Sequence, residues 1–223
     1  MAPVRMPLRR ALARWLFAAT TLAALMSAGV VLAVPDVAFG TAFHQFAAAS
    51  AGDGDAVDKA AEAFDALLKT EPANPVLMAY AGASTAMRAG TTMLPWKKMS
   101  YAEDGLALID KALALLTPAH DAPLQRQVPG VLEVKLVAAS TFLAVPSFMQ
   151  RAERGGKLLG DVLASPLLAD APLGFKGSVW MRAAEQAAKE QRSADARRWF
   201  GEVIAQHAPQ ADKARSRLKE LAT

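Results

Sequence analysis

Histidine, cysteine and acidic side chains are the groups of this sequence that could bind a metal or transfer protons. The three histidines, His44, His120 and His207, are far apart and lack the H-x-x-x-H or H-x-x-E-H spacing of a zinc site. The chain contains no cysteine, which excludes a disulfide framework, a thiolate nucleophile and a cysteine-based zinc site. We therefore predict no catalytic residue, no metal ligand and no cofactor.

Two groups of acidic residues leave alternatives open. The three carboxylates Asp53, Asp55 and Asp58 suggest a calcium site, but the glycine and the later ligands of an EF-hand loop are missing. A turn with an aspartate cap before a helix explains them better. The pair Glu103-Asp104 is expected at a helix start, where acids complement the helix dipole. Two carboxylates could still meet in the fold, as in a glycosidase, so an enzyme stays the alternative to a non-catalytic protein.

Residues 91–100 have the composition of a partner-binding surface. Trp and Met are enriched where proteins bind partners, because they contribute large apolar contact areas. Pro95 is expected to stop a helix and to present the segment as a defined turn. We predict that this segment docks a partner and that its lysines steer an acidic partner or a lipid head group. In the alternative, its apolar side chains fold back and cover the core. The predicted docking residues are Met93, Leu94, Trp96, Lys97, Lys98 and Met99.

The spacing of apolar residues predicts that helices position these groups. Phe39, Phe43 and Phe46 stand three and four residues apart, which places three rings on one helix face, where we expect them to pack in the core. For 131–145 a strand stays the alternative to a buried helix. The expected helices are 36–51, a helix that begins near 56 and ends before Pro72, one that begins at 74–75, 101–116, 131–145, 147–164, 175–191, 193–207 with a Ser193 cap, and 211–222.

A recurring pattern of small residue, large residue and proline joins these helices into pairs. It is clearest in Ala60, Phe64 and Pro72, at spacings of four and eight, and recurs in Ala196 and Phe200, while Gly82 falls where two paired helices cross. Arg154 replaces the small residue in the third pair, which puts close packing there in doubt. The prolines at 72, 118, 166 and 209 mark units of 46, 48 and 43 residues, longer than a regular 34-residue repeat and nearer to HEAT-type repeats.

On these residues the chain resembles a degenerate, exported bacterial tetratricopeptide-repeat-like protein. The resemblance implies an all-α array of helical hairpins, an α-α superhelix over residues 36–223 that is closed by a C-terminal capping helix. It also implies a non-catalytic scaffold that holds a peptide or protein partner in a groove lined by the first helix of each hairpin. In the second unit the predicted groove residues are Val76, Ala79, Ala83, Ala86 and Met87. Residues 34–46 of the chain itself are the alternative cover of this surface.

Residues 1–33 are predicted to be an export signal or a membrane anchor. Arg5, Arg9, Arg10 and Arg14 precede an uncharged apolar run at 15–34. Cleavage would leave a periplasmic protein, whereas retention would make an accessory subunit anchored in the inner membrane and facing the periplasm. The formal charge of +4 falls to zero without these four arginines. The folded part therefore has no net positive field for binding nucleic acid.

Overall fold

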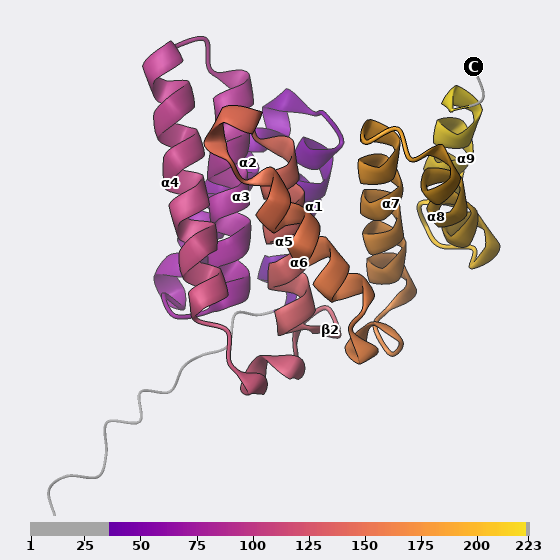
Figure 1. The fold of residues 1–223 in the computed structure, drawn as a ribbon. Coiled ribbons are helices and arrows are strands. Elements are labelled where there is room, and N and C mark those ends of the chain that lie inside the picture. The colour runs from indigo at the N-terminus through magenta and orange to yellow at the C-terminus, as the bar shows by residue number, and fades with distance from the viewer. Residues whose placement is uncertain (1–35, 222–223) are drawn as a thin grey trace, which may run out of the picture. The chain divides into compact units, whose positions relative to one another are not determined.

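The computed structural model describes residues 36–221, which belong to one compact unit and are almost entirely helical, as the sequence predicts (Figure 1). The α-helices of this part are α1 Asp36–Ser50, α2 Gly54–Thr70, α3 Pro75–Thr91, α4 Pro95–Ala114, α5 Gly130–Ala144, α6 Ala152–Leu163, α7 Leu173–Lys189, α8 Ser193–Ala205 and α9 Ala211–Glu220. The strand alternative for 131–145 is wrong, because α5 occupies this segment. The predicted signal or anchor at 1–33 lies outside the described residues. Within the described residues, no helix is long and apolar enough to span a membrane.

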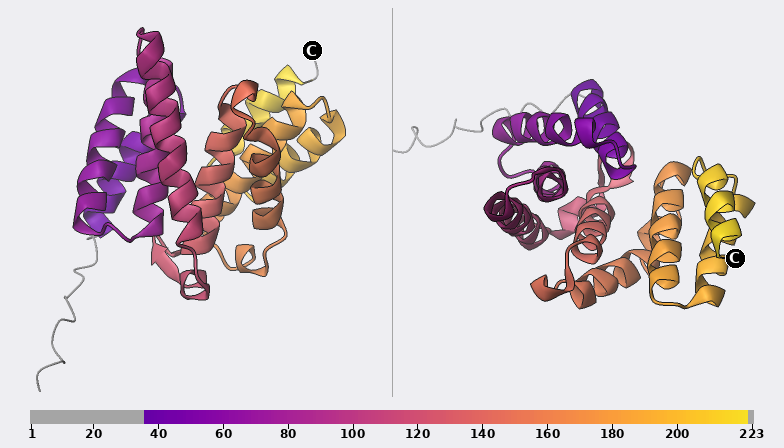
Figure 2. Two further views of the ribbon diagram at one scale, coloured as in Figure 1. Left: turned by 60° about the vertical axis from the view of Figure 1, so that its left-hand side comes forward. Right: turned by 90° about the horizontal axis from the view of Figure 1, so that it is seen from above.

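The helices pack as successive hairpins. α1 packs on α2, α3 on α4, α5 on α6 and α7 on α8, and α9 covers α8 at the C-terminal end. α3 also contacts α2 and α5, which joins the first three hairpins into one body (Figure 2). α9 contributes Ala214 and Leu218 to the last core cluster, its C-cap residue Leu221 joins them, and its charged residues lie in solvent, as a capping helix requires.

Side-chain caps and prolines set several of the helix starts. Asp53 accepts a hydrogen bond from the Asp55 backbone amide and begins α2, so the predicted aspartate cap is confirmed. Asn74 accepts from the amides of Val76 and Leu77 and begins α3. The predicted serine cap of α8 is wrong: Ser193 is the first helical residue and the N-cap position is Arg192.

The largest error of helix prediction is at Pro95. We expected Pro95 to stop a helix, but it is the first residue of α4, which begins six residues before the predicted start. The first turn of a helix tolerates proline, since the missing amide would have no intrahelical acceptor there. Glu103 and Asp104 consequently lie inside α4, and the argument from the helix dipole does not apply to them.

The third hairpin also differs from the prediction. The segment 147–164 divides into a 3₁₀ helix, η2 Ser147–Met149, and α6, with Gln150 between them in the left-handed conformation at φ +53°. Close packing with α5 is retained through Gly155, one residue after Arg154. A Cβ atom added to Gly155 would lie 2.9 Å from Leu143 Cγ and 3.1 Å from Phe142 Cβ.

Two glycines bring α3 and α4 into backbone contact. A Cβ atom added to Gly82 would lie 2.6 Å from the carbonyl oxygen of Gly105, and one added to Gly105 would clash with the backbone of Gly82 and Ala86. The predicted close crossing at Gly82 is therefore confirmed. The contact partner is a second glycine, so two backbones meet with no side chain between them.

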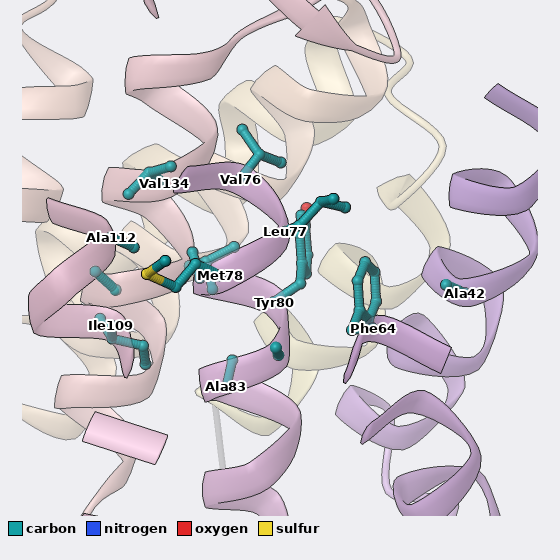
Figure 3. Close-up of a cluster of buried hydrophobic side chains, with 14 of the residues drawn as sticks. Ala42, Phe64, Val76, Leu77, Met78, Tyr80, Ala83, Ile109, Ala112 and Val134 are labelled. Atoms are coloured by element: carbon teal, nitrogen blue, oxygen red, sulfur yellow. The ribbon is translucent and has the colours of Figure 1, made fainter. Parts of the chain in front are cut away.

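The core of the first hairpins is rich in aromatic rings. Tyr80 lies 4.8 Å from both Phe46 and Phe64 between ring centroids, and Phe39 packs edge-on against Phe64 and Tyr80 at 5.7 and 5.6 Å. Figure 3 shows Phe64 and Tyr80 side by side in this cluster. The prediction that the phenylalanines of the first helix pack in the core is confirmed. Further core clusters of the described residues lie around α5–α7 and around α7–α9, and a small one lies between the end of α1 and the start of α2.

Candidate binding cavity

A cavity of about 710 Å³ lies among the first helices of the four hairpins, α1, α3, α5 and α7. This volume falls within the range of small-molecule sites in proteins, about 300–1,000 Å³. Most of its wall is apolar, and its larger apolar side chains are Phe43, Phe46, Met87, Leu136, Val137, Phe175 and Met181. The arrangement suits a ligand with an apolar body.

The structure divides the predicted groove residues into two groups. Ala83, Ala86 and Met87 line the cavity. Val76 and Ala79 do not: both are fully buried in the first core cluster. The first turns of α3 are enclosed because α1, α2, α4 and α5 all pack against this helix, so the groove begins later on α3 than repeat phasing predicts.

The alternative cover of the groove, residues 34–46, lies within the described part from residue 36 onward, where it forms one wall of the cavity and does not fill it. Phe43 and Phe46 of α1 line the cavity and pack against Tyr80, at centroid distances of 5.8 and 4.8 Å. The alternative cover proposed for the groove therefore accounts for one side of it and leaves about 710 Å³ open.

Three polar side chains form a cluster in the cavity wall: Tyr80 on α3, Arg126, and Glu133 on α5. The Tyr80 hydroxyl donates to Glu133 Oε1 at 2.8 Å. Arg126 Nη2 donates to the Tyr80 hydroxyl at 3.0 Å and forms a short ion pair with the same Glu133 oxygen. Glu133 is fully buried, so Arg126 supplies the counter-charge that a buried carboxylate requires.

A tight hairpin in the segment before α5 positions Arg126. Strands β1 Pro123–Gln125 and β2 Val128–Pro129 pair antiparallel, with Arg126 and Gln127 as the two loop residues. Both have positive φ, +50° and +59°, as a type I′ hairpin turn requires. Non-glycine residues seldom adopt this conformation, and such strain is typical of functional positions. The guanidinium lies 3.5 Å from the centroid of the Phe43 ring, a cation–π contact that fixes its plane.

Burial controls ionisation in the polar cluster. Loss of solvent raises the pKa of Glu133 above its ordinary value, although Arg126 and the hydrogen bonds from Arg126 and Tyr80 act in the opposite direction. Burial, together with the nearby Glu133 carboxylate, raises the pKa of Tyr80 well above its usual value. Tyr80 consequently keeps its proton at neutral pH and acts as a hydrogen-bond donor.

A second set of charged groups lines the cavity on α7 and α9. Glu185 lies 3.4 Å from Arg182 and 3.6 Å from Lys213, and Arg182 Nε donates to Ser140 Oγ at 3.1 Å. These groups are partly exposed, so solvent weakens the attraction within each ion pair. They give this side of the cavity a polar rim.

The predicted docking segment, which we call the tip segment (residues 91–100), stands at the end of the α3–α4 hairpin (Figure 1). It contains the last residue of α3, a short connection and the first turns of α4. Met93 is 87% exposed and Trp96 67% exposed, and Leu94, Lys97, Lys98 and Met99 are also exposed. The alternative that these side chains cover the core is therefore wrong.

The other sequence candidates have local structural partners. Asp58 pairs with Arg88 at 2.7 Å, and His120 Nδ1 accepts from the Thr117 backbone amide at 2.9 Å. Glu133, the one fully buried carboxylate of residues 36–221, pairs with Arg126 and not with a second carboxyl group. No three His, Asp or Glu side chains in that range are grouped as metal ligands.

Sequence reasoning missed Tyr80 and Arg126 as site residues. One signal was visible: Glu133 is one of two charged residues in an otherwise apolar helix, and a buried acid requires a partner. Nothing in the sequence indicates that Arg126, in a polar connection, is this partner. No family model, no curated protein and no solved structure matches this chain.

Proposed function

We propose that this protein is a non-catalytic binding protein that holds an amphipathic ligand, or an apolar segment of a peptide or protein partner, in the cavity among α1, α3, α5 and α7. The single observation behind this proposal is the cavity itself, about 710 Å³ with a mainly apolar wall. The tetratricopeptide-like pattern of the sequence supports the same function, since arrays of this kind bind partners on the face lined by first helices.

The pairing of charges supports a binding role over a catalytic one. Glu133 pairs with Arg126, and Glu185 pairs with Arg182 and Lys213. A general base or nucleophile needs a free group directed at the substrate. In this cavity each carboxylate is held in an ion pair with a cation, although Glu133 is paired through only one of its two oxygens.

A fluorescent apolar probe tests occupancy of the cavity. N-phenyl-1-naphthylamine, a neutral dye that brightens in apolar surroundings, should bind the purified protein. Ala47 is exposed and lines the cavity, so Ala47→Phe fills space without disturbing the core and should weaken dye binding at least fivefold. His44→Phe is the matched control, because His44 is exposed on the same helix but does not line the cavity. Equal dye affinity in the two variants would contradict the proposal.

The tip segment supports a second, separate binding function. We propose that it docks a partner protein with an acidic surface, since Trp96 and Met93 offer exposed apolar area beside Lys97 and Lys98. A photo-crosslinking amino acid at position 96 should capture a defined partner in cells. The same group at Ser216, an exposed position on α9, should not capture it. Reversing the charge of Lys97 and Lys98 to glutamate should abolish capture, and capture that persists would contradict this proposal.

We propose a periplasmic location on the basis of residues 1–33, with a membrane-anchored accessory subunit of a transport or envelope-assembly complex as the alternative. The intact mass of the protein isolated from the envelope fraction distinguishes these two cases. A chain that begins near Val34 indicates cleavage and release, whereas an intact chain in the membrane indicates the anchored subunit.

A further inference from the structure

The polar cluster of the cavity contains unpaired hydrogen-bonding atoms. Glu133 Oε1 accepts from both Tyr80 and Arg126, but Glu133 Oε2 has no hydrogen-bond partner, and neither does Arg126 Nε. Both atoms are buried, and both residues line the cavity. Unpaired buried polar atoms are rare in native proteins because they lose hydration without gaining a partner, so their presence in a cavity wall requires an explanation.

We infer that these two atoms recognise the head of the ligand, and that this head is a neutral group that both donates and accepts a hydrogen bond, such as a hydroxyl or a primary carboxamide. This inference rests on the proposed cavity-binding function and specifies its ligand class. The head donates to Glu133 Oε2 and accepts from Arg126 Nε–H, and the apolar body lies against Phe46, Met87 and Leu136.

Charge compensation in the cluster selects against ionised heads. Arg126 and Glu133 already neutralise each other, and the hydroxyl of Tyr80 is uncharged. A ligand carboxylate would approach the buried Glu133, and a ligand ammonium would approach the partly buried Arg126. Either ion would lose its hydration and meet a like charge, whereas a hydroxyl or an amide meets one donor and one acceptor.

Burial of Glu133 Oε2 and Arg126 Nε increases the binding free energy that a ligand gains by forming hydrogen bonds with them. A polar atom that already lies out of water has no hydration to lose when a ligand arrives, so the new hydrogen bond is offset by less desolvation. The cation–π contact with Phe43 and the hairpin turn hold the Arg126 guanidinium in place before binding. The cluster is therefore preorganised for the head group.

A set of eight-carbon probes with different heads tests this inference by displacement of N-phenyl-1-naphthylamine from the purified protein. Octan-1-ol and octanamide should displace the dye at concentrations at least tenfold lower than octanoate and octylammonium. Methyl octyl ether accepts a hydrogen bond but cannot donate one, so it should also be at least tenfold weaker than octan-1-ol.

Glu133→Gln provides an independent test through a change in preference. The variant removes the negative charge and leaves Arg126 without its counter-ion. Octanoate should then bind at least tenfold more tightly than it does to the unaltered protein, and octan-1-ol more weakly. If this variant does not fold, the comparison of the octyl probes on the unaltered protein still tests the inference.

The outcomes separate the two proposals. Displacement by all octyl probes within threefold of one another would overturn the head-group inference and leave the cavity-binding function intact. Dye binding that is absent, or that Ala47→Phe does not weaken, would overturn the binding function and the inference together.

Discussion

At the residue scale, the polar cluster connects the backbone conformation of the Arg126–Gln127 turn to the ionisation of Glu133. The hairpin turn formed by Arg126 and Gln127, both with positive φ, places the Arg126 guanidinium against the Phe43 ring. In this position the guanidinium pairs with the buried carboxylate of Glu133. Buried ion pairs of this kind are weak sources of stability, because desolvation offsets the attraction between the charges. Their position in a cavity wall favours a role in recognition.

The raised pKa of Glu133 predicts a pH dependence of stability. In the unfolded chain a glutamate ionises at about pH 4.3, and burial keeps the proton on folded Glu133 to a higher pH. Between these values the folded state binds more protons than the unfolded state, so this group lowers the free energy of unfolding as pH rises. Arg126 and Tyr80, which face it, keep their protons over this range.

Denaturant titrations of the wild type and Glu133→Gln between pH 4 and pH 8 check this prediction. The free energy of unfolding of the wild type, relative to the variant, should fall as pH rises through and above the ordinary glutamate pKa. A relative stability that rises with pH over this interval would show that Arg126 outweighs burial and lowers the pKa.

At the element scale, the crossing of α3 and α4 depends on two glycines. Gly82→Ala should lower the free energy of unfolding by about 1–3 kcal/mol, because the added Cβ meets the Gly105 carbonyl and neither backbone can move away easily. Gly90 is the matched control on the same helix. A Cβ atom there meets nothing within 4 Å, so Gly90→Ala should stabilise the protein by up to about 1 kcal/mol. Chemical denaturation of both variants measures the difference, and equal effects would contradict the close crossing.

The tip segment is expected to contribute little to stability. Trp96 is 67% exposed at the start of α4, so Trp96→Ala should change the free energy of unfolding by less than about 0.5 kcal/mol. Phe64 is fully buried, and Phe64→Ala should cost about 3–5 kcal/mol. Thermal melting of the two variants provides the comparison. A large loss of stability in the Trp96 variant would mean that the segment packs against the core in solution.

The elements also show what sequence reasoning could determine. The phenylalanine spacing of α1, the aspartate cap of α2 and the glycine of the α3–α4 crossing could be predicted, because each is a local pattern with a physical cause. Pro95 was misjudged because the same proline that stops one helix is favoured at the first position of the next. The polar cluster escaped prediction because its members come from α3, a hairpin loop and α5, and only tertiary packing brings them together.

At the scale of the whole described unit, the core is distributed along the array. One cluster lies around α1–α5 and includes Phe64, a second lies around α5–α7, and a third lies around α7–α9 and includes Phe200. In an array of hairpins each unit contacts mainly its neighbours, so stability is the sum of local terms and the ends can open separately. The cavity lies where the first helices of all four hairpins face one another, so ligand binding should couple these local units.

Hydrogen exchange of two core variants tests whether the core clusters unfold separately. Phe200→Ala removes a fully enclosed ring from the third cluster and should speed amide exchange in α8 and α9 at least tenfold while leaving α2 and α3 unchanged. Phe64→Ala should speed amide exchange in α2 and α3 and leave α8 and α9 unchanged, because the Phe64 ring packs against Phe39, Phe46 and Tyr80 in the first cluster. Exchange that rises uniformly along the chain in both variants would show a single cooperative unit. In that case ligand binding in the cavity would stabilise all helices equally, and not chiefly the four first helices that line it.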